Sequence, residues 1–277
     1  MSFKIVVDSC CDLTPQMLQD SCFVKVPLTI RVEDSTFVDD ENFDQADLLW
    51  AMRQSESAPS TSCPSPQAYL DACHGADDVY VVTLSALLSG SHNSAEQARM
   101  LLEEDEPQVN VHVFNSCSAA AGEVLVALKV RELAQSGMAF KHVVREVEQF
   151  IYKMQTMFVL ETLENLRKNG RLTKLQAVVT GALKIKLVMG ATPEGEICKL
   201  GQALTMKQAL GKLVDRMAAD PDHQGRVAAV CHCNCLERAF ALKEQIEAKC
   251  QFQQVLILEA GGITTVYAND GGVVVAY

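Results

Sequence analysis

Short runs of β-branched apolar residues alternate along this chain with segments whose apolar residues recur at every third or fourth position. The clearest run is residues 79–82, VYVV, which has the composition of a buried strand. It is followed by a helical pattern in which Ala95, Ala98, Leu101 and Leu102 share one face. The same succession of strand-like and helix-like segments continues through both halves of the chain, which predicts an α/β fold.

Four junctions that lead into predicted helices are rich in small polar residues. They are DSCCDLTP, STSCPSP, SALLSGSHNSA and NSCSAAAGE, and three of them directly follow a predicted strand. In a parallel sheet such junctions gather at the carboxyl ends of the strands, where ligands bind. The third junction combines the hydroxyl of Ser89 with the free backbone N–H groups of a helix start, which favours an anion. A plain helix cap is the alternative for this serine.

Local signals set the expected ends of several elements. Thr14 and Pro15 are expected to begin a helix, as are Ser65 and Pro66, because Ser or Thr followed by Pro is typical of a helix start. Residues 55–66 are rich in Ser, Ala and Pro, so a loop is expected there. Gly170 is expected to end a short helix immediately before Arg171.

Length and charge narrow the classes of protein to consider. The chain has 277 residues, enough for one large domain or two ordinary ones with a proper core. Its 35 acidic and 24 basic side chains give a net charge of −11, and no cluster of Lys and Arg offsets it. Nucleic acid is therefore not expected as a partner.

No signal peptide is visible at the N-terminus, and the apolar region around residues 175–191 is interrupted by Lys184 and Lys186. A cytoplasmic location is therefore expected. The 11 cysteines are scattered through apparent core segments, which suits reduced thiols without disulfides in a reducing compartment.

The chain resembles the DegV family of bacterial fatty-acid-binding proteins, which includes the fatty-acid-carrying subunit of the fatty acid kinase system. The resemblance rests on segments that follow one another in the same order: VVDSCCDLTPQML, VPL, TSCPSP, SALLSGSHNSA, NS at residues 115–116, and ETLENLRKNGRL. It implies two α/β domains, residues 1–158 with a mostly parallel sheet and residues 159–277 with a mixed sheet. A lipid cavity is expected between or beneath them.

The resemblance also implies a function and a set of ligand-binding residues. The chain is expected to be a non-enzymatic carrier that binds one long-chain fatty acid non-covalently, with no cofactor and no metal. Its expected partners are a fatty acid kinase subunit, which forms the acyl phosphate, and transiently a membrane surface. Thr61 or Ser62 is expected to hold the carboxylate together with Ser89 and the adjacent Gly90. Arg171 matches the arginine of the family's GR motif near the ligand opening.

One departure from the family falls in the C-terminal segment ITTVYANDGGVVVAY. Many members carry a histidine there, but this chain has Tyr267 at that position or, in a shifted register, Val266. A phenolic hydroxyl can still donate a hydrogen bond to a carboxylate. Tyr267 is therefore included among the expected ligand-binding residues.

Two other interpretations of the sequence remain open at this stage. Ser89 could be the nucleophile of an acyl hydrolase or transferase, although Leu87 stands where a nucleophile elbow needs glycine. The segment CHCNC, residues 231–235, could bind a metal, but on a strand its cysteines would share one buried face, which favours core packing. Asn234 followed by Glu237 also resembles the start of a helix.

Overall fold

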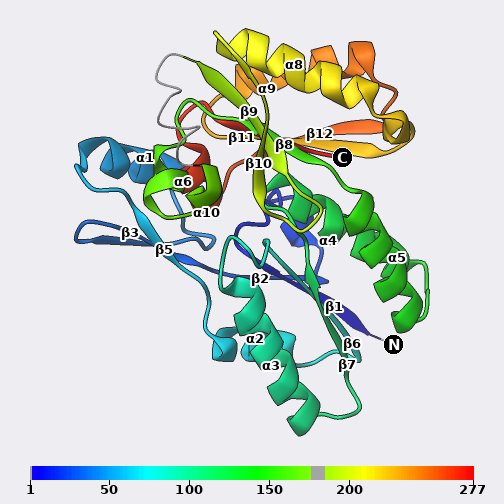
Figure 1. Ribbon diagram of the computed structural model, residues 1–277. Coiled ribbons are helices and arrows are strands. Elements are labelled where there is room, and N and C mark those ends of the chain that lie inside the picture. The colour runs from blue at the N-terminus through cyan, green and yellow to red at the C-terminus, as the bar shows by residue number, and fades with distance from the viewer. Residues whose placement is uncertain (1, 176–184) are drawn as a thin grey trace.

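The computed structural model describes residues 2–175 and 185–277, and it contains two main β-sheets with helices between and around them (Figure 1). The first sheet has four parallel strands in the order β2-β1-β6-β7. These strands are β1 (Phe3–Asp8), β2 (Phe23–Val26), β6 (Asp78–Thr83) and β7 (Asn110–Asn115).

Helices cover both faces of the first sheet, because its strands carry apolar side chains on both sides. On one face, Val6, Val79 and Val81 pack against α2 (Pro66–Cys73) and α3 (Ser91–Asp105). On the other face, Tyr80 and Val82 pack against α4 (Ala121–Gln135) and α5 (Phe140–Lys153). Both faces are therefore closed to solvent, as the continuous apolar run at residues 79–82 predicts.

Helix α4 lies between the two main sheets. Its residues 121–127 are all buried, including Glu123. The helix contacts β1 and β6 of the first sheet and also β11 and β13 of the second. The first two turns of α4 are suited to such a position, because apart from Glu123 they are apolar on every side and none of their residues meets water.

The second sheet has six strands in the order β10-β9-β8-β13-β11-β12, with only β11 and β12 parallel. Helices α8 (Met206–Ala219) and α9 (Leu236–Lys249) cover its outer face (Figure 1). The strands are β8 (Thr156–Val159), β9 (Lys186–Ala191), β10 (Ile197–Ala203), β11 (Val227–His232), β12 (Gln254–Glu259) and β13 (Val273–Ala276).

A third, smaller sheet stands beside the two main sheets, close to three short helices (Figure 1). It is antiparallel, in the order β4-β3-β5, and consists of β3 (Thr29–Val32), β4 (Ser35–Val38) and β5 (Ser60–Ser62). The helices are α1 (Gln45–Gln54), α6 (Glu164–Lys168) and α10 (Gly262–Ala268). Single 3-10 turns occur at η1 (Met17–Gln19), η2 (Thr173–Leu175) and η3 (Pro221–His223).

The α/β class, the parallel first sheet and the mixed second sheet are confirmed. Helix α2 begins as expected, with the Ser65 hydroxyl accepting from Ala68 N and Pro66 in the first turn. The proposed division between residues 158 and 159 falls inside β8 and stays a prediction. Two lysines interrupt the apolar region at residues 175–191. Lys184 lies outside the described residues, and Lys186 is the first residue of β9. No described helix combines the length and apolar character needed to span a bilayer.

Three local predictions are wrong. Residues 60–62 form strand β5 instead of a loop, because they pair with β3. Only the turn η1 follows Thr14, although the Thr14 hydroxyl does accept from Met17 N at 3.2 Å. A helix does start at the expected place, since α9 begins after Cys235, but the expected cap is wrong because the Asn234 side chain donates to Asp270 instead of capping α9.

Candidate functional site

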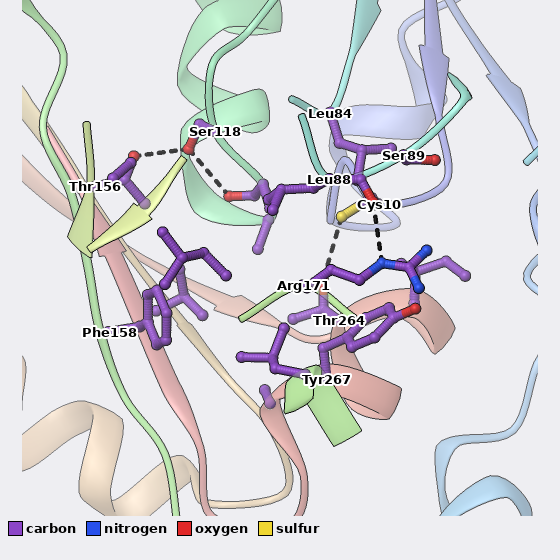
Figure 2. A pocket seen from close by; sticks show the side chains of 18 of the residues that line it. Cys10, Leu84, Leu88, Ser89, Ser118, Thr156, Phe158, Arg171, Thr264 and Tyr267 are labelled. Carbon is purple, nitrogen blue, oxygen red and sulfur yellow. Dashed lines mark hydrogen bonds between the residues drawn. The ribbon is translucent and has the colours of Figure 1, made fainter. Parts of the chain in front are cut away.

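A cavity lined mainly by apolar residues lies where the loops of the first sheet meet the second sheet and helix α10 (Figure 2). Its accessible volume is about 100 Å³. By the same measure one water needs roughly 10–15 Å³, so the space exceeds that of a single water several-fold. Its apolar lining includes Leu28, Leu84, Leu88, Phe158, Leu160 and Ile263.

Three polar residues of the lining, Ser89, Arg171 and Tyr267, lie on one side of this cavity (Figure 2). The hydroxyls of Thr61 and Tyr267 are 2.8 Å apart and hydrogen bonded. The guanidinium carbon of Arg171 lies 5.5 Å from the centre of the Tyr267 ring, which is within cation–π range. Ser89 completes the group, and we refer to Thr61, Ser89, Arg171 and Tyr267 as the polar cluster.

Each member of the polar cluster is fixed by local structure. Thr61 is held by the pairing of β5 with β3, where it stands opposite Ile30. The Ser89 hydroxyl accepts a hydrogen bond of 3.2 Å from the backbone N–H of Ser91, in the first turn of α3. Among the described residues, no hydrogen bond joins that hydroxyl to a histidine. The serine–histidine hydrogen bond of a typical serine hydrolase is therefore not seen at Ser89 among these residues.

Arg171 is positioned by the end of helix α6. Gly170 adopts a positive φ of 78°, as expected for the residue that ends this helix, and Arg171 N donates to Leu166 O at 2.8 Å. The Arg171 side chain then donates to the carbonyls of Leu88 at 3.1 Å and Asn169 at 2.5 Å. Among the described residues, the hydrogen-bond partners of its side chain are these carbonyls, and no ion pair with a carboxylate is formed.

Helix α10, which carries Tyr267, is held by two buried carboxylates from the N-terminal half of the chain. Asp39 accepts from the backbone N–H groups of Gly262 at 2.8 Å and Ile263 at 3.0 Å. Asp12 accepts from Gly261 N at 2.7 Å. Together these carboxylates bind three successive N–H groups at the start of a helix that has no side-chain cap of its own.

Asp12 makes two further hydrogen bonds, accepting from the Thr264 hydroxyl at 2.8 Å and the Cys231 thiol at 3.1 Å. Burial has the largest effect on the pKa of Asp12 and raises it to about 7, whereas these hydrogen bonds lower it. Burial raises the pKa of Asp39 as well. Cys231 thus serves as a hydrogen-bond donor in the core, and burial also raises the pKa of its thiol well above the ordinary value.

A second pair of buried carboxyl groups, Asp8 and Glu123, lies near Cys10 of the cavity lining. Burial raises the pKa of Asp8 and of Glu123, and the charge of Asp8 adds to the effect on Glu123. Asp8 accepts hydrogen bonds from the Ser91 hydroxyl at 2.7 Å and from Leu84 N at 3.0 Å. It thereby ties the loop that leads to Ser89 to the end of strand β1.

The structure brings together four of the six residues expected to bind ligand. Ser62 is exposed and does not line the cavity, because neighbouring residues of β5 point to opposite sides and Thr61 is the one that faces inward. Gly90 is exposed as well; it precedes α3 and lines an outer depression next to Ser89 and Arg171.

Sequence reasoning missed two features of the cavity. The first is the support of helix α10 by Asp12 and Asp39. Asp12 could have been noticed in the sequence, because it lies in DSCCD, in the turn that follows strand β1. Ser118 and Thr156 also line the cavity, and the structure hydrogen bonds their hydroxyls at 2.7 Å. Thr156 could have been noticed as the polar first residue of a strand whose alternate residues, Phe158 and Leu160, are apolar.

The fold and the cavity define a class: an α/β protein of two main sheets around a mainly apolar cavity with a polar cluster on one side. The chain belongs to the DegV family, whose model, described as uncharacterised proteins, matches residues 2–277. A DegV domain-containing protein of Streptococcus pyogenes serotype M1 is 36% identical over 279 residues, which covers 100% of this chain and 99% of the relative.

Solved structures of similar proteins hold fatty acids. A DegV family protein from Ruminococcus gnavus, refined with vaccenic acid, is 46% identical with a TM-score of 0.96, and 100% of each chain is covered. The fatty acid kinase B3 protein of Streptococcus pneumoniae, loaded with linoleic acid, is 34% identical with a TM-score of 0.92, covering 100% of this chain and 99% of that one. A DegV family protein from Eubacterium eligens, loaded with heptadecanoic acid, is 28% identical with a TM-score of 0.92, covering 99% of each chain.

Proposed function

We propose that this protein is a carrier that binds one long-chain fatty acid non-covalently, with the acyl tail in the cavity and the carboxylate at the polar cluster. The observation that carries the proposal is an apolar cavity with hydroxyls on one side, together with an arginine that has no carboxylate partner among the described residues. The fatty acids in the similar proteins of known structure support it.

The two ends of the ligand would contribute differently to binding. Burial of a tail of roughly 14 methylenes at about 0.8 kcal/mol each offers on the order of 11 kcal/mol before ordering costs. Hydrogen bonds to the carboxylate, at about 1.5–3 kcal/mol each, add less. The tail would therefore supply most of the affinity, and Thr61, Ser89, Arg171 and Tyr267 would fix which end lies at the polar cluster.

The proposed role is transport, with the chemistry done by a partner. The likeness to the fatty acid kinase B3 protein supports a kinase subunit as that partner, to which the carboxylate would be presented for formation of an acyl phosphate. We place this exchange in the cytoplasm, with transient contact at a membrane surface when the acid is loaded. In this proposal the protein has no resident metal or cofactor, and Ser62 and Gly90 have no direct contact with the ligand.

Mass spectrometry of lipid extracted from denatured protein tests the proposal. One equivalent of free fatty acid is expected, and protein that is empty under every growth condition would contradict it. The same protein should then be delipidated and titrated with stearic acid. A Thr61→Val variant is expected to bind more weakly, whereas Ser62→Ala, one residue along the same strand, should match the wild type.

A fluorophosphonate probe tests the hydrolase alternative in parallel. If Ser89 were a nucleophile, its side chain would become covalently labelled, and the fatty acid would be a product instead of cargo. Unlabelled protein that releases intact fatty acid is the result expected of a carrier.

A further inference from the structure

A second polar group lies in the cavity, away from the polar cluster. It consists of Ser118, in the loop before α4, and Thr156, the first residue of β8. Their hydroxyl oxygens are 2.7 Å apart, and both side chains line the cavity. Figure 2 shows this pair on the opposite side of the cavity from Arg171, Ser89 and Tyr267.

Thr156 interrupts an apolar stripe. Alternate residues of a strand share a face, and Thr156, Phe158 and Leu160 all line the cavity. The intervening Met157 and Val159 belong instead to the core beneath α8 and α9. Valine and threonine have the same β-branched shape, so the shape of the site alone does not require a hydroxyl at position 156.

The hydrogen bonds of the pair are not saturated. Two hydroxyls carry two protons and four acceptor lone pairs. One proton lies between the two oxygens, and the only other acceptor that the described residues offer to Ser118 Oγ is Ala119 O at 3.4 Å, near the limit for a hydrogen bond. Among the described residues, each oxygen therefore keeps at least one lone pair without a hydrogen-bond donor, and both residues line the cavity.

We propose that Ser118 and Thr156 recognise a hydroxyl group on the acyl chain, so that the preferred ligand is a hydroxylated long-chain fatty acid. This inference rests on the proposed function. A hydroxyl on the chain would donate to one oxygen of the pair and accept from the other. Because the pair lies across the cavity from the polar cluster, the recognised hydroxyl belongs to the interior or the methyl half of the chain, not to the carbons next to the carboxylate.

Competition binding to delipidated protein tests this inference. The ligands are stearic acid and positional isomers of hydroxystearic acid, with the hydroxyl near the carboxylate, at mid-chain or near the methyl end. The wild type is expected to bind one of the latter two isomers about tenfold more tightly than stearic acid, the gain from one well-placed hydrogen bond. The isomer hydroxylated next to the carboxylate should show no such gain.

Two variants test whether Ser118 and Thr156 cause the preference for the hydroxylated acid. Thr156→Val and Ser118→Ala are each expected to abolish the tenfold preference while stearic acid affinity stays within about threefold, which also shows that the variants are folded. Thr36→Val, on an exposed position of strand β4, is the matched control and should keep the preference.

The outcomes separate this inference from the proposed function. Stearic acid bound as tightly as every hydroxylated isomer, or a preference that survives both variants, would overturn the inference and leave the carrier function standing. Binding of none of the acids would overturn the carrier function and this inference with it.

Discussion

The hydroxyl of Tyr267 offers the sharpest test of the polar cluster. In Tyr267→Phe the ring remains, so its contact with the Arg171 guanidinium at 5.5 Å is kept. Only the hydroxyl that bonds Thr61 at 2.8 Å is removed. The substitution therefore separates a hydrogen bond at the cluster from the packing of helix α10.

The expected size of the effect follows from what that hydroxyl can contact. A hydrogen bond to a charged carboxylate contributes about 1.5–3 kcal/mol, so its loss should raise Kd for stearic acid by about 10- to 150-fold. In the ligand-free protein the lost bond to Thr61 joins two half-buried, neutral groups, and the free energy of unfolding should fall by about 1 kcal/mol or less. The variant should thus be folded and clearly weaker in binding.

Titration calorimetry with delipidated protein measures the effect, and stearyl alcohol serves as a ligand without the carboxylate. Tyr152→Phe is the matched control, because Tyr152 is 75% exposed and outside the cavity lining. An unchanged Kd for stearic acid in Tyr267→Phe would refute the role of the hydroxyl. An equal loss for acid and alcohol would refute its role in holding the carboxylate.

Three further changes test the charge, the pH response and the packing of the site. Arg171→Met is expected to lower the affinity for stearic acid about tenfold and to remove the salt dependence of that binding. The affinity for methyl stearate should not change, since only the acid is charged. Because the folded pKa of Asp12 is about 7, against an ordinary 3.8, its buried carboxyl loses a proton more readily in the unfolded chain. Relative to Asp12→Asn, the wild type should therefore lose up to about 4 kcal/mol of unfolding free energy between pH 4 and pH 7 in urea titrations, and a pH-independent difference would contradict this. Gly262→Ala should lower the free energy of unfolding by about 1–3 kcal/mol, because the added methyl would lie 2.9 Å from Asp39 Oδ1. Gly211→Ala, in an open part of helix α8, should instead raise it by about 0.5–1 kcal/mol, and equal effects of the two would argue against crowding at Gly262.

Much of the fold could be predicted from periodicity alone. The runs at residues 4–7, 79–82 and 109–114 became β1, β6 and β7. The run at 79–82 is apolar on both faces, which suits a central strand of a parallel sheet, whereas residues 109–114 alternate with Asn110 and His112 and form an edge strand. Strand β5 could not be predicted in this way. It has three residues, STS, whose extended form depends on pairing with β3 some thirty positions earlier, and local composition carries no trace of that partner.

The candidate site was predictable as a set of hydroxyls at strand-to-helix junctions, but not as a geometry. The choice between Thr61 and Ser62 depends on which face of β5 turns inward, and only the register with β3 decides that. The contact between Thr61 and Tyr267 joins residues 206 positions apart. Tertiary packing alone brings such residues together, so no window of sequence contains the signal.

The position of Tyr267 depends on Asp12 and Asp39, which both come from the first forty residues. A helix of seven residues is marginal by itself, and α10 lacks a side-chain cap, so these two carboxylates supply the acceptors that its first N–H groups require. Glycine at positions 261 and 262 permits the approach, since a Cβ at either position would lie about 3.0 Å or 2.9 Å from a carboxylate oxygen. These contacts at the start of the helix also set where Tyr267 lies at the cavity. Under the proposed function the carboxylate would bind beside this hydroxyl, and the acyl chain would occupy the remaining cavity, which includes the hydroxyls of Ser118 and Thr156.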